Sequence, residues 1–276
     1  MNTLRSILVH LDGTTRAEAR LQLAHGLAAA HGASLTALFA VSPRVLTVLP
    51  MMGGPPPMPL GGEIDPDHRE RALALFERLL LHHPTRCDWR EMRGEPVIER
   101  FVQRALTCDL MVLGQRDTRD ASGFDVPVDF IEAVVLASGK PALVVPLSGS
   151  ASPKPEKVLV AWRATRESAH ALSAALPLLQ SAEEVHLVAA AGPDDPVPPM
   201  LALRIFLRMH GIERMHEHRT LQERNAGEAL LRLATRVGAG LLVMGAYGHS
   251  RARELVLGGA TRTVLADATV PVWMAH

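Results

Sequence analysis

The chain has 276 residues, 47% of them hydrophobic and 21% charged, which is enough apolar material for one large domain or two of ordinary size. Its 29 basic and 29 acidic residues balance, which excludes the basic excess typical of proteins that bind nucleic acid through phosphate contacts. The two cysteines lack metal-ligand spacing and indicate reduced thiols. The first residues lack the apolar length of a signal peptide, and no run approaches the roughly 20 apolar residues of a membrane span. We expect a soluble, cytoplasmic protein with neither a membrane nor a nucleic-acid partner.

Short apolar runs alternate with amphipathic stretches along the chain. The first half has predicted strands at 6–11, 34–41, 87–93, 109–114 and 141–146, with a helix at 16–31 after the first strand. The second half has predicted strands at 157–162, 184–190, 215–219, 240–246 and 271–275, with helices at 167–179, at 226–237 and after Ala260. Strands that are apolar throughout and alternate with helices are typical of a parallel sheet covered on both faces.

The second half repeats the first. An offset of 151 residues aligns the two openings without gaps, so that Ile7 matches Val158 and Thr14 matches Thr165. Later segments match as well, 109–114 with 240–245 and 141–146 with 271–276, at an offset about 20 residues smaller because the first half is longer. Between the copies, residues 148–156 have the composition of a linker. The fold class is therefore α/β, with two tandem, doubly wound, five-stranded Rossmann-like domains at 1–147 and 156–276.

The first half carries an insertion at 44–63. The segment is rich in proline, glycine and methionine, which argues against any regular structure. We expect a mobile, disordered loop, although its methionines could also dock on a partner.

Glycines gather where the second half should bind a ligand. In doubly wound sheets, ligands bind beyond the carboxyl ends of the strands where the strand order reverses. Glycines there let the backbone approach an anion, and the free amides at a helix start suit phosphate oxygens. After the fourth strand of the second half, we expect a ligand to be faced by several glycines and by the residues beside them. These are Gly245, Gly248, His249, Arg251, Gly258, Gly259 and Ala260.

The spacing Gly245-x-x-Gly248, nine residues, then Gly258 resembles the nucleotide-binding signature of universal stress proteins, as does the opening Val-His-Leu-Asp12-Gly13-Thr14. The resemblance covers nearly the whole chain outside 44–63. It implies that the first-strand Asp and the end of the second strand hold adenine and ribose, while the glycine loop and the hydroxyl after it hold the phosphates. It also implies that the final strands of the two halves pair, giving an intramolecular pseudo-dimer that a further homodimer could extend.

Each half departs from that family pattern. Gly259 stands in place of the family's Ser or Thr, with Thr261 two residues on, and Arg163 replaces the first-strand Asp of the second half. Arginine cannot accept hydrogen bonds but could pair with phosphate. The first half keeps Asp12, but Asp117 replaces its second glycine, and we expect Asp117 and Asp125 to repel phosphate. We therefore expect one nucleotide per chain, ATP or another adenine nucleotide, in the second half.

The sequence favours binding over catalysis. It has no nucleophile elbow, no Walker loop and no evident holder for Mg²⁺. His216 and His218 would share one face of a strand, but no third ligand is evident, so we expect no metal site. The preferred hypothesis is a stress-response regulatory protein with no catalytic residues and at most slow ATP hydrolysis. The alternatives are a nucleotide-free scaffold that acts through protein partners, and a weak ATPase or nucleotide-dependent transferase.

Overall fold

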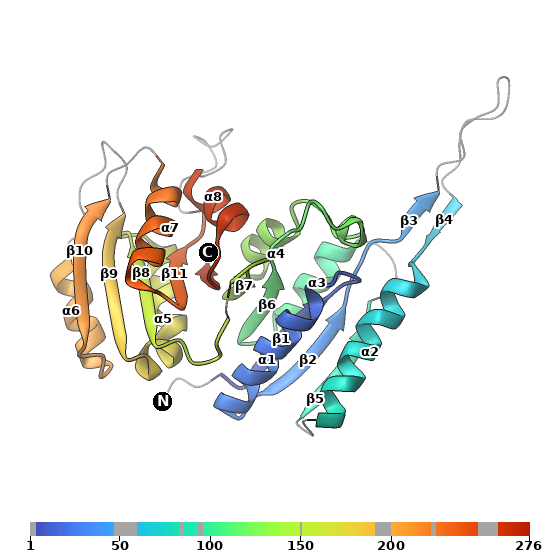
Figure 1. Ribbon diagram of the computed structural model, residues 1–276, viewed down its shortest axis with the longest axis horizontal. Helices are drawn as coiled ribbons and strands as arrows, with labels where there is room; N and C mark the ends of the chain where they lie inside the picture. The colour runs from blue at the N-terminus through green and yellow to red at the C-terminus, as the bar shows by residue number, and fades with distance from the viewer. Residues whose placement is uncertain are drawn as a thin grey trace, which may run out of the picture.

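The computed structural model describes residues 4–46, 60–82, 86–92, 96–149, 151–190, 200–221, 225–247 and 259–276. Its main body is a single ten-stranded sheet with helices on both faces, and the two sequence halves lie side by side along it (Figure 1). No helix in these ranges combines the length and apolar character that crossing a membrane requires.

Each half contributes five parallel strands. Those of the N-terminal half are β1 (Ser6–Leu11), β2 (Ser34–Phe39), β5 (Cys87–Glu91), β6 (Leu110–Gly114) and β7 (Ala142–Val145). Those of the C-terminal half are β8 (Lys157–Trp162), β9 (Glu184–Ala190), β10 (Met215–Leu221), β11 (Leu241–Gly245) and β12 (Val272–Ala275). The order across the sheet is β10-β9-β8-β11-β12-β7-β6-β1-β2-β5, so both halves have the same doubly wound topology. The predicted fold class is confirmed.

The helices divide evenly between the two faces. The helices are α1 (Ala17–His31), α2 (Pro66–His82), α3 (Val97–Ala105), α4 (Phe130–Ser138), α5 (Arg166–Ser181), α6 (Met200–Met209), α7 (Ala226–Val237) and α8 (Gly259–Asp267). Buried side chains of α1, α2, α5 and α6 pack in one core on one face, and those of α3, α4, α7 and α8 pack in a second core on the other. Successive strand residues alternate between the cores, as Ile7 and Leu8 do, because neighbouring side chains of a strand point to opposite faces.

The two halves join through their last strands. β12 pairs with β7 in antiparallel register, with Trp273 opposite Leu143, and both side chains are buried. The junction has the pairing that the family resemblance implies. At the outer edges of the sheet, β5 and β10 carry charged and polar residues, which discourage further strand addition.

The insertion differs from the prediction at its two ends. Residues Arg44–Leu46 form β3 and Leu60–Glu63 form β4, and the two strands pair antiparallel, Arg44 opposite Glu63. The expectation of no regular structure across 44–63 was therefore wrong for both ends, because an antiparallel pair needs only a few residues on each arm to satisfy its backbone groups. The Pro- and Gly-rich centre, 47–59, lies outside the described residues.

The segment after β7 is fixed to the C-terminal half at Gly149. This glycine has φ +97°, and a Cβ there would overlap the carbonyl oxygen of Thr269. Gly139, which follows α4, also has a positive φ, +60°, but a Cβ there would meet nothing within 4 Å. Both positions thus have a positive φ, but only at Gly149 would a Cβ also clash with another part of the protein.

We therefore expect Gly149→Ala to destabilise the protein by about 3 kcal/mol and Gly139→Ala by about 1 kcal/mol, the second value being the strain of a positive φ alone. Denaturant unfolding of the two variants beside the wild type measures both. Equal losses would mean that the Thr269 contact adds nothing.

Candidate functional site

The carboxyl end of β1 in the N-terminal half carries a buried ion pair. Oδ1 of Asp12 accepts hydrogen bonds from the amide and the hydroxyl of Thr14, at 3.0 and 2.6 Å, and lies 2.8 Å from Nη2 of Arg20 in α1. Asp12 and Arg20 are 5% and 3% exposed. The Arg20 guanidinium also lies directly over Gly114 at the end of β6, in the space that a Cβ there would need. The protein's own side chains therefore fill this edge of the sheet.

Burial alone would favour the neutral forms of both titratable groups here. It would raise the pKa of Asp12, but Arg20, then His10 and the Thr14 hydroxyl, outweigh it and lower that pKa to about 2. Burial, and next the charge of Arg20, lower the pKa of His10 to about 4. At neutral pH, Asp12 is therefore ionised, and His10 is neutral with Nε2 2.8 Å from the Ala40 carbonyl oxygen.

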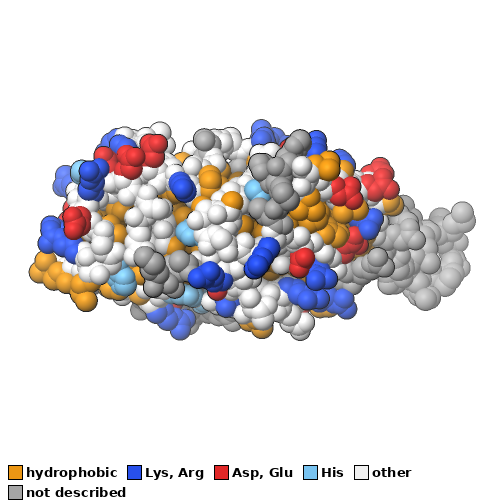
Figure 2. All heavy atoms as spheres, turned by 90° about the horizontal axis from the view of Figure 1, so that it is seen from below, with side chains coloured by type: hydrophobic (Ala, Val, Ile, Leu, Met, Phe, Trp, Pro, Cys, Tyr) orange, Lys and Arg blue, Asp and Glu red, His pale blue; other side chains and the backbone are white. Residues whose placement is uncertain are grey.

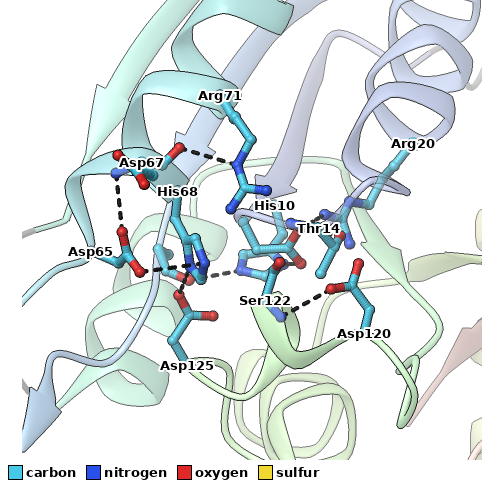
Figure 3. A network of polar contacts seen from close by, with 12 residues as sticks. His10, Thr14, Arg20, Asp65, Asp67, His68, Arg71, Asp120, Ser122 and Asp125 are labelled. Carbon is cyan, nitrogen blue, oxygen red and sulfur yellow. Dashed lines mark hydrogen bonds and ion pairs between the residues drawn. The ribbon is translucent and has the colours of Figure 1, made fainter.

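A second polar pair closes the same edge (Figure 3). Nδ1 of His68, in the first turn of α2, lies 2.7 Å from Oδ2 of Asp125, and both residues are buried. The His68 ring packs so tightly on Gly13 that no Cβ would fit there. Asp125, which we expected to repel phosphate, thus faces an imidazole, and the repulsion stays a prediction. Asp117 lies nearby, with Oδ1 accepting from the Arg119 amide at 2.9 Å.

Asp120 takes a position at the helix start. Its Oδ2 accepts a hydrogen bond of 3.4 Å from the amide of Thr15, just before α1. Its Oδ1 accepts a hydrogen bond of 2.9 Å from the amide of Ser122. A carboxylate of the protein thus occupies backbone amides that could otherwise donate hydrogen bonds to a bound anion. The space that remains beside Asp12 and Arg20 is a cavity of about 40 Å³.

In the C-terminal half, part of the predicted site is described. Arg163 follows β8 directly and Gly245 is the last residue of β11, and because the two strands pair in parallel, both residues lie at one edge of the sheet. The Arg163 amide donates to Oγ of Ser168 at 3.3 Å, and its carbonyl accepts from the Thr165 amide at 2.8 Å. Gly245 is needed for packing, because a Cβ would come within 2.6 Å of the Ser168 amide nitrogen.

The remaining predicted residues divide into two sets. Gly259, Ala260 and Thr261 form the first turn of α8, where Gly259 is exposed and Thr261 is 5% exposed. The Thr261 side chain is thus buried. The predicted positions that lie outside the described residues are Gly248, His249, Arg251 and Gly258.

Residues 154–276 match the model of the Universal stress protein family. Residues 154–276 therefore correspond to a universal stress protein domain. Solved structures of similar fold extend the likeness to 99% of the chain: one is a universal stress protein from Archaeoglobus fulgidus DSM 4304, 16% identical with TM-score 0.67 and 96% of its own chain covered. A putative universal stress protein from Pseudomonas aeruginosa UCBPP-PA14 is also 16% identical, with TM-score 0.61 and 93% of its chain covered. No curated protein matches the chain.

The two universal stress protein folds also touch each other near their ligand edges, the edges of the sheet at the carboxyl ends of the parallel strands. Gln115, directly after β6, donates from Nε2 to the carbonyl of Ala266 in α8 at 2.5 Å and accepts the Leu147 amide at 2.7 Å. Tyr247, after β11, is 8% exposed, and burial and then the Glu132 carboxylate of α4 raise the pKa of its phenol. In each half, therefore, a residue just after the fourth strand of the sheet contacts the last helix of the other half, which is α8 for Gln115 and α4 for Tyr247.

The sequence interpretation missed several of these residues. Arg20 could have been found, because it occupies the buried stripe of α1 with Ala17, Leu21 and Ala24, where a lone arginine needs a partner. His68 and Gln115 carry no such signal. His186 of β9 also carries no such signal in the sequence. Its Nδ1 lies 2.9 Å from Nε2 of His218, and its ring stacks on the rings of His216 and His218. Within the described ranges, no three His, Cys, Asp or Glu side chains form a group that could hold a metal ion.

The buried, neutral state of His10 has a consequence for stability. Its pKa lies below the unfolded value of 6.5, so the unfolded chain binds more protons between pH 6.5 and 4, and stability falls as the pH falls through that window. From pH 7 to pH 5, His10 should contribute a loss of about 2 kcal/mol. His10→Gln should remove that contribution, as measured by urea unfolding of wild type and variant at both pH values. The same loss of stability in both proteins would show that His10 does not carry it.

Proposed function

We propose that the chain is a cytoplasmic stress-response regulatory protein that binds one molecule of ATP, or another adenine nucleotide, in its C-terminal half. In this proposal the backbone around Gly245, Gly248, Gly258 and Gly259 holds the phosphates. Arg163, His249 and Arg251 supply side-chain contacts, and Ala260 and Thr261 complete the turn that follows. The family membership of residues 154–276 supports the choice of ligand class.

One difference between the halves supports the choice of site. Arg20, which lies over Gly114 in the N-terminal half, corresponds by the 151-residue offset to Ala171 in α5. Ala171 is fully buried and has no side chain that could reach across Gly245. A guanidinium therefore covers the ligand edge of the first half, and its counterpart in the second half is a methyl group.

Binding is favoured over rapid turnover. The groups that a phosphoryl-transfer enzyme needs are a positioned base for water and a Mg²⁺ holder. The described part of the ligand edge in the C-terminal half includes the cation Arg163 and the carboxylate Glu167. The Glu167 carboxylate accepts a hydrogen bond of 2.6 Å from Nε of Arg166, and the residue is 5% exposed. We therefore expect hydrolysis to be slow at most, and we assign no site to Mg²⁺.

A second candidate is a nucleotide-free scaffold. On α6, Leu201, Ile205 and Met209 are 68%, 49% and 81% exposed, and their spacing places them on one side of the helix. Hydrophobic side chains are visible at the end of the molecule formed by α6 and β10 (Figure 2). An exposed apolar stripe of this kind favours contact with another protein.

The test is to release and identify any nucleotide that co-purifies with the native protein, for the wild type, Gly259→Asp and Gly259→Ala. Position 259 is exposed at the start of α8, and no atom of the described residues lies within 4 Å of an added Cβ, so both variants should fold, and the aspartate should also favour the helix start. We expect near one nucleotide per chain in the wild type and in the alanine control. The aspartate should weaken binding at least about tenfold through repulsion of the phosphates.

An empty protein that also shows no thermal shift with millimolar ATP would contradict nucleotide binding and leave the scaffold as the better hypothesis. Equal occupancy in the aspartate variant would mean that the phosphates do not lie at the start of α8.

A further inference from the structure

Three histidines gather at the outer edge of the C-terminal half. Nδ1 of His186, in β9, lies 2.9 Å from Nε2 of His218 on the neighbouring strand β10. The His186 ring also stacks on the rings of His216 and His218, with centroids 5.0 and 5.1 Å away. His186 and His216 are direct partners in the register of the two strands. The three imidazoles therefore form one histidine cluster, which joins the two outermost strands at this end of the sheet.

Charged side chains surround the histidine cluster on three elements. Oε2 of Glu184, in β9, lies 3.3 Å from Nε2 of His186. The same oxygen lies 3.2 Å from Nζ of Lys157 in the adjacent strand β8. From α7, the charge of Arg236 acts on His218. The charges that the described residues place beside the cluster are thus one carboxylate, already paired with a lysine, and two cations.

The contact between the His186 and His218 rings depends on their protonation. In the hydrogen bond between them, one facing nitrogen carries the proton and the other accepts it, so at least one ring has to be neutral. Burial, and next the charge of a neighbouring imidazole, lower the pKa of both residues, so both rings are neutral at pH 7. A first added proton can be held between His186 and Glu184. A second puts N–H groups on both facing nitrogens, which removes the hydrogen bond and leaves two cations in contact.

The strand β10 is held weakly at the edge of the sheet. None of its seven residues is buried, and its pairing with β9 is irregular between His218 and Leu221. On its opposite face, Glu217 forms an exposed ion pair of 3.7 Å with Arg204 of α6. Segments with few buried contacts open at a low cost in free energy. Repulsion within the histidine cluster therefore acts on a strand that can separate with little loss of packing.

The histidine cluster is particular to the C-terminal half. At the other end of the sheet, β2 and β5 pair in the same register, and Thr36, Asp88 and Arg90 occupy the three matching positions. Nη2 of Arg90 lies 3.6 Å from Oδ2 of Asp88, so the neighbouring side chains on β5 attract each other. An edge that responds to the charge of imidazoles is therefore not a general property of this fold.

We propose that the histidine cluster makes the pairing of β9 with β10 sensitive to pH, closed at pH 7 and opened as the second proton binds below about pH 6. Opening releases β10 and leaves backbone groups of β9 without partners on that side. The cluster lies in the amino-terminal half of both strands, away from the ligand edge. The device is therefore independent of nucleotide binding.

The test is amide hydrogen exchange of the full chain at about pH 7 and about pH 5.5, expressed as protection factors, which removes the pH dependence of the chemical exchange rate. Protection of residues 215–221 should fall about tenfold or more as the pH falls. The reason is that each ring that is neutral in the closed strand and free to bind a proton in the released strand contributes up to about eightfold over this range. Protection in β11 and β12 should change little.

Two variants locate the effect. His218→Gln keeps a hydrogen-bonding side chain on β10, at a position that is not buried, but removes the ring that receives the second proton. His210→Gln is the matched control, because this half-buried histidine at the end of α6 contacts the Phe206 ring outside the cluster. We expect the fall in protection of 215–221 to shrink to about threefold or less in His218→Gln and to keep its wild-type size in His210→Gln.

Three results would overturn the proposal. The first is equal protection of 215–221 at both pH values in the wild type. The second is a loss in β11 and β12 as large as that in β10, since the whole half would then open together. The third is a fall of wild-type size in His218→Gln.

Discussion

The antiparallel pairing of β7 with β12 is the interaction on which the arrangement of the molecule depends. Each half alone would expose an edge strand with unpaired backbone groups and apolar side chains, and each covers the edge of the other. Because the pairing is antiparallel, the carboxyl end of β7 lies beside the amino end of β12. That brings Gln115, at the ligand edge of one half, to the carbonyl of Ala266 in the other. A contact between a ligand edge and a helix of the opposite half is thus a result of how the sheets join.

The two ligand edges are built on the same topology and have different interiors. In the N-terminal half, three carboxylates already have partners within the protein: Asp12 lies against Arg20, Asp125 against His68, and Asp120 caps the amides near α1. These contacts reduce the edge to a small cavity. In the C-terminal half, Arg163 stands where Asp12 stands, and Ala171 stands where Arg20 stands. The two edges thus differ in the charge of the residue after the first strand, Asp12 or Arg163. They also differ in the size of one side chain in the following helix, Arg20 or Ala171.

The sequence predicts what depends on periodicity and repetition. The predicted strand at 157–162 coincides with β8, and the helix at 226–237 coincides with α7, because apolar runs and glycine C-caps are local signals. It does not predict what depends on side chains meeting across the fold. His68 and Asp125 are 57 residues apart in the chain, and nothing local in either indicates that they meet beneath Gly13. The hairpin of β3 and β4 was missed for a similar reason, since composition describes the centre of the insertion better than its two ends.

The fusion of the two copies through the segment around Gly149 bears on how such a molecule can change over time. In a dimer of identical subunits, any substitution is made twice, so an arginine that fills one ligand edge fills both. In this chain one copy carries Arg20 and the other carries Ala171 at the matching position. A single covalent link therefore permits asymmetry, and each copy can change its ligand edge without changing that of the other.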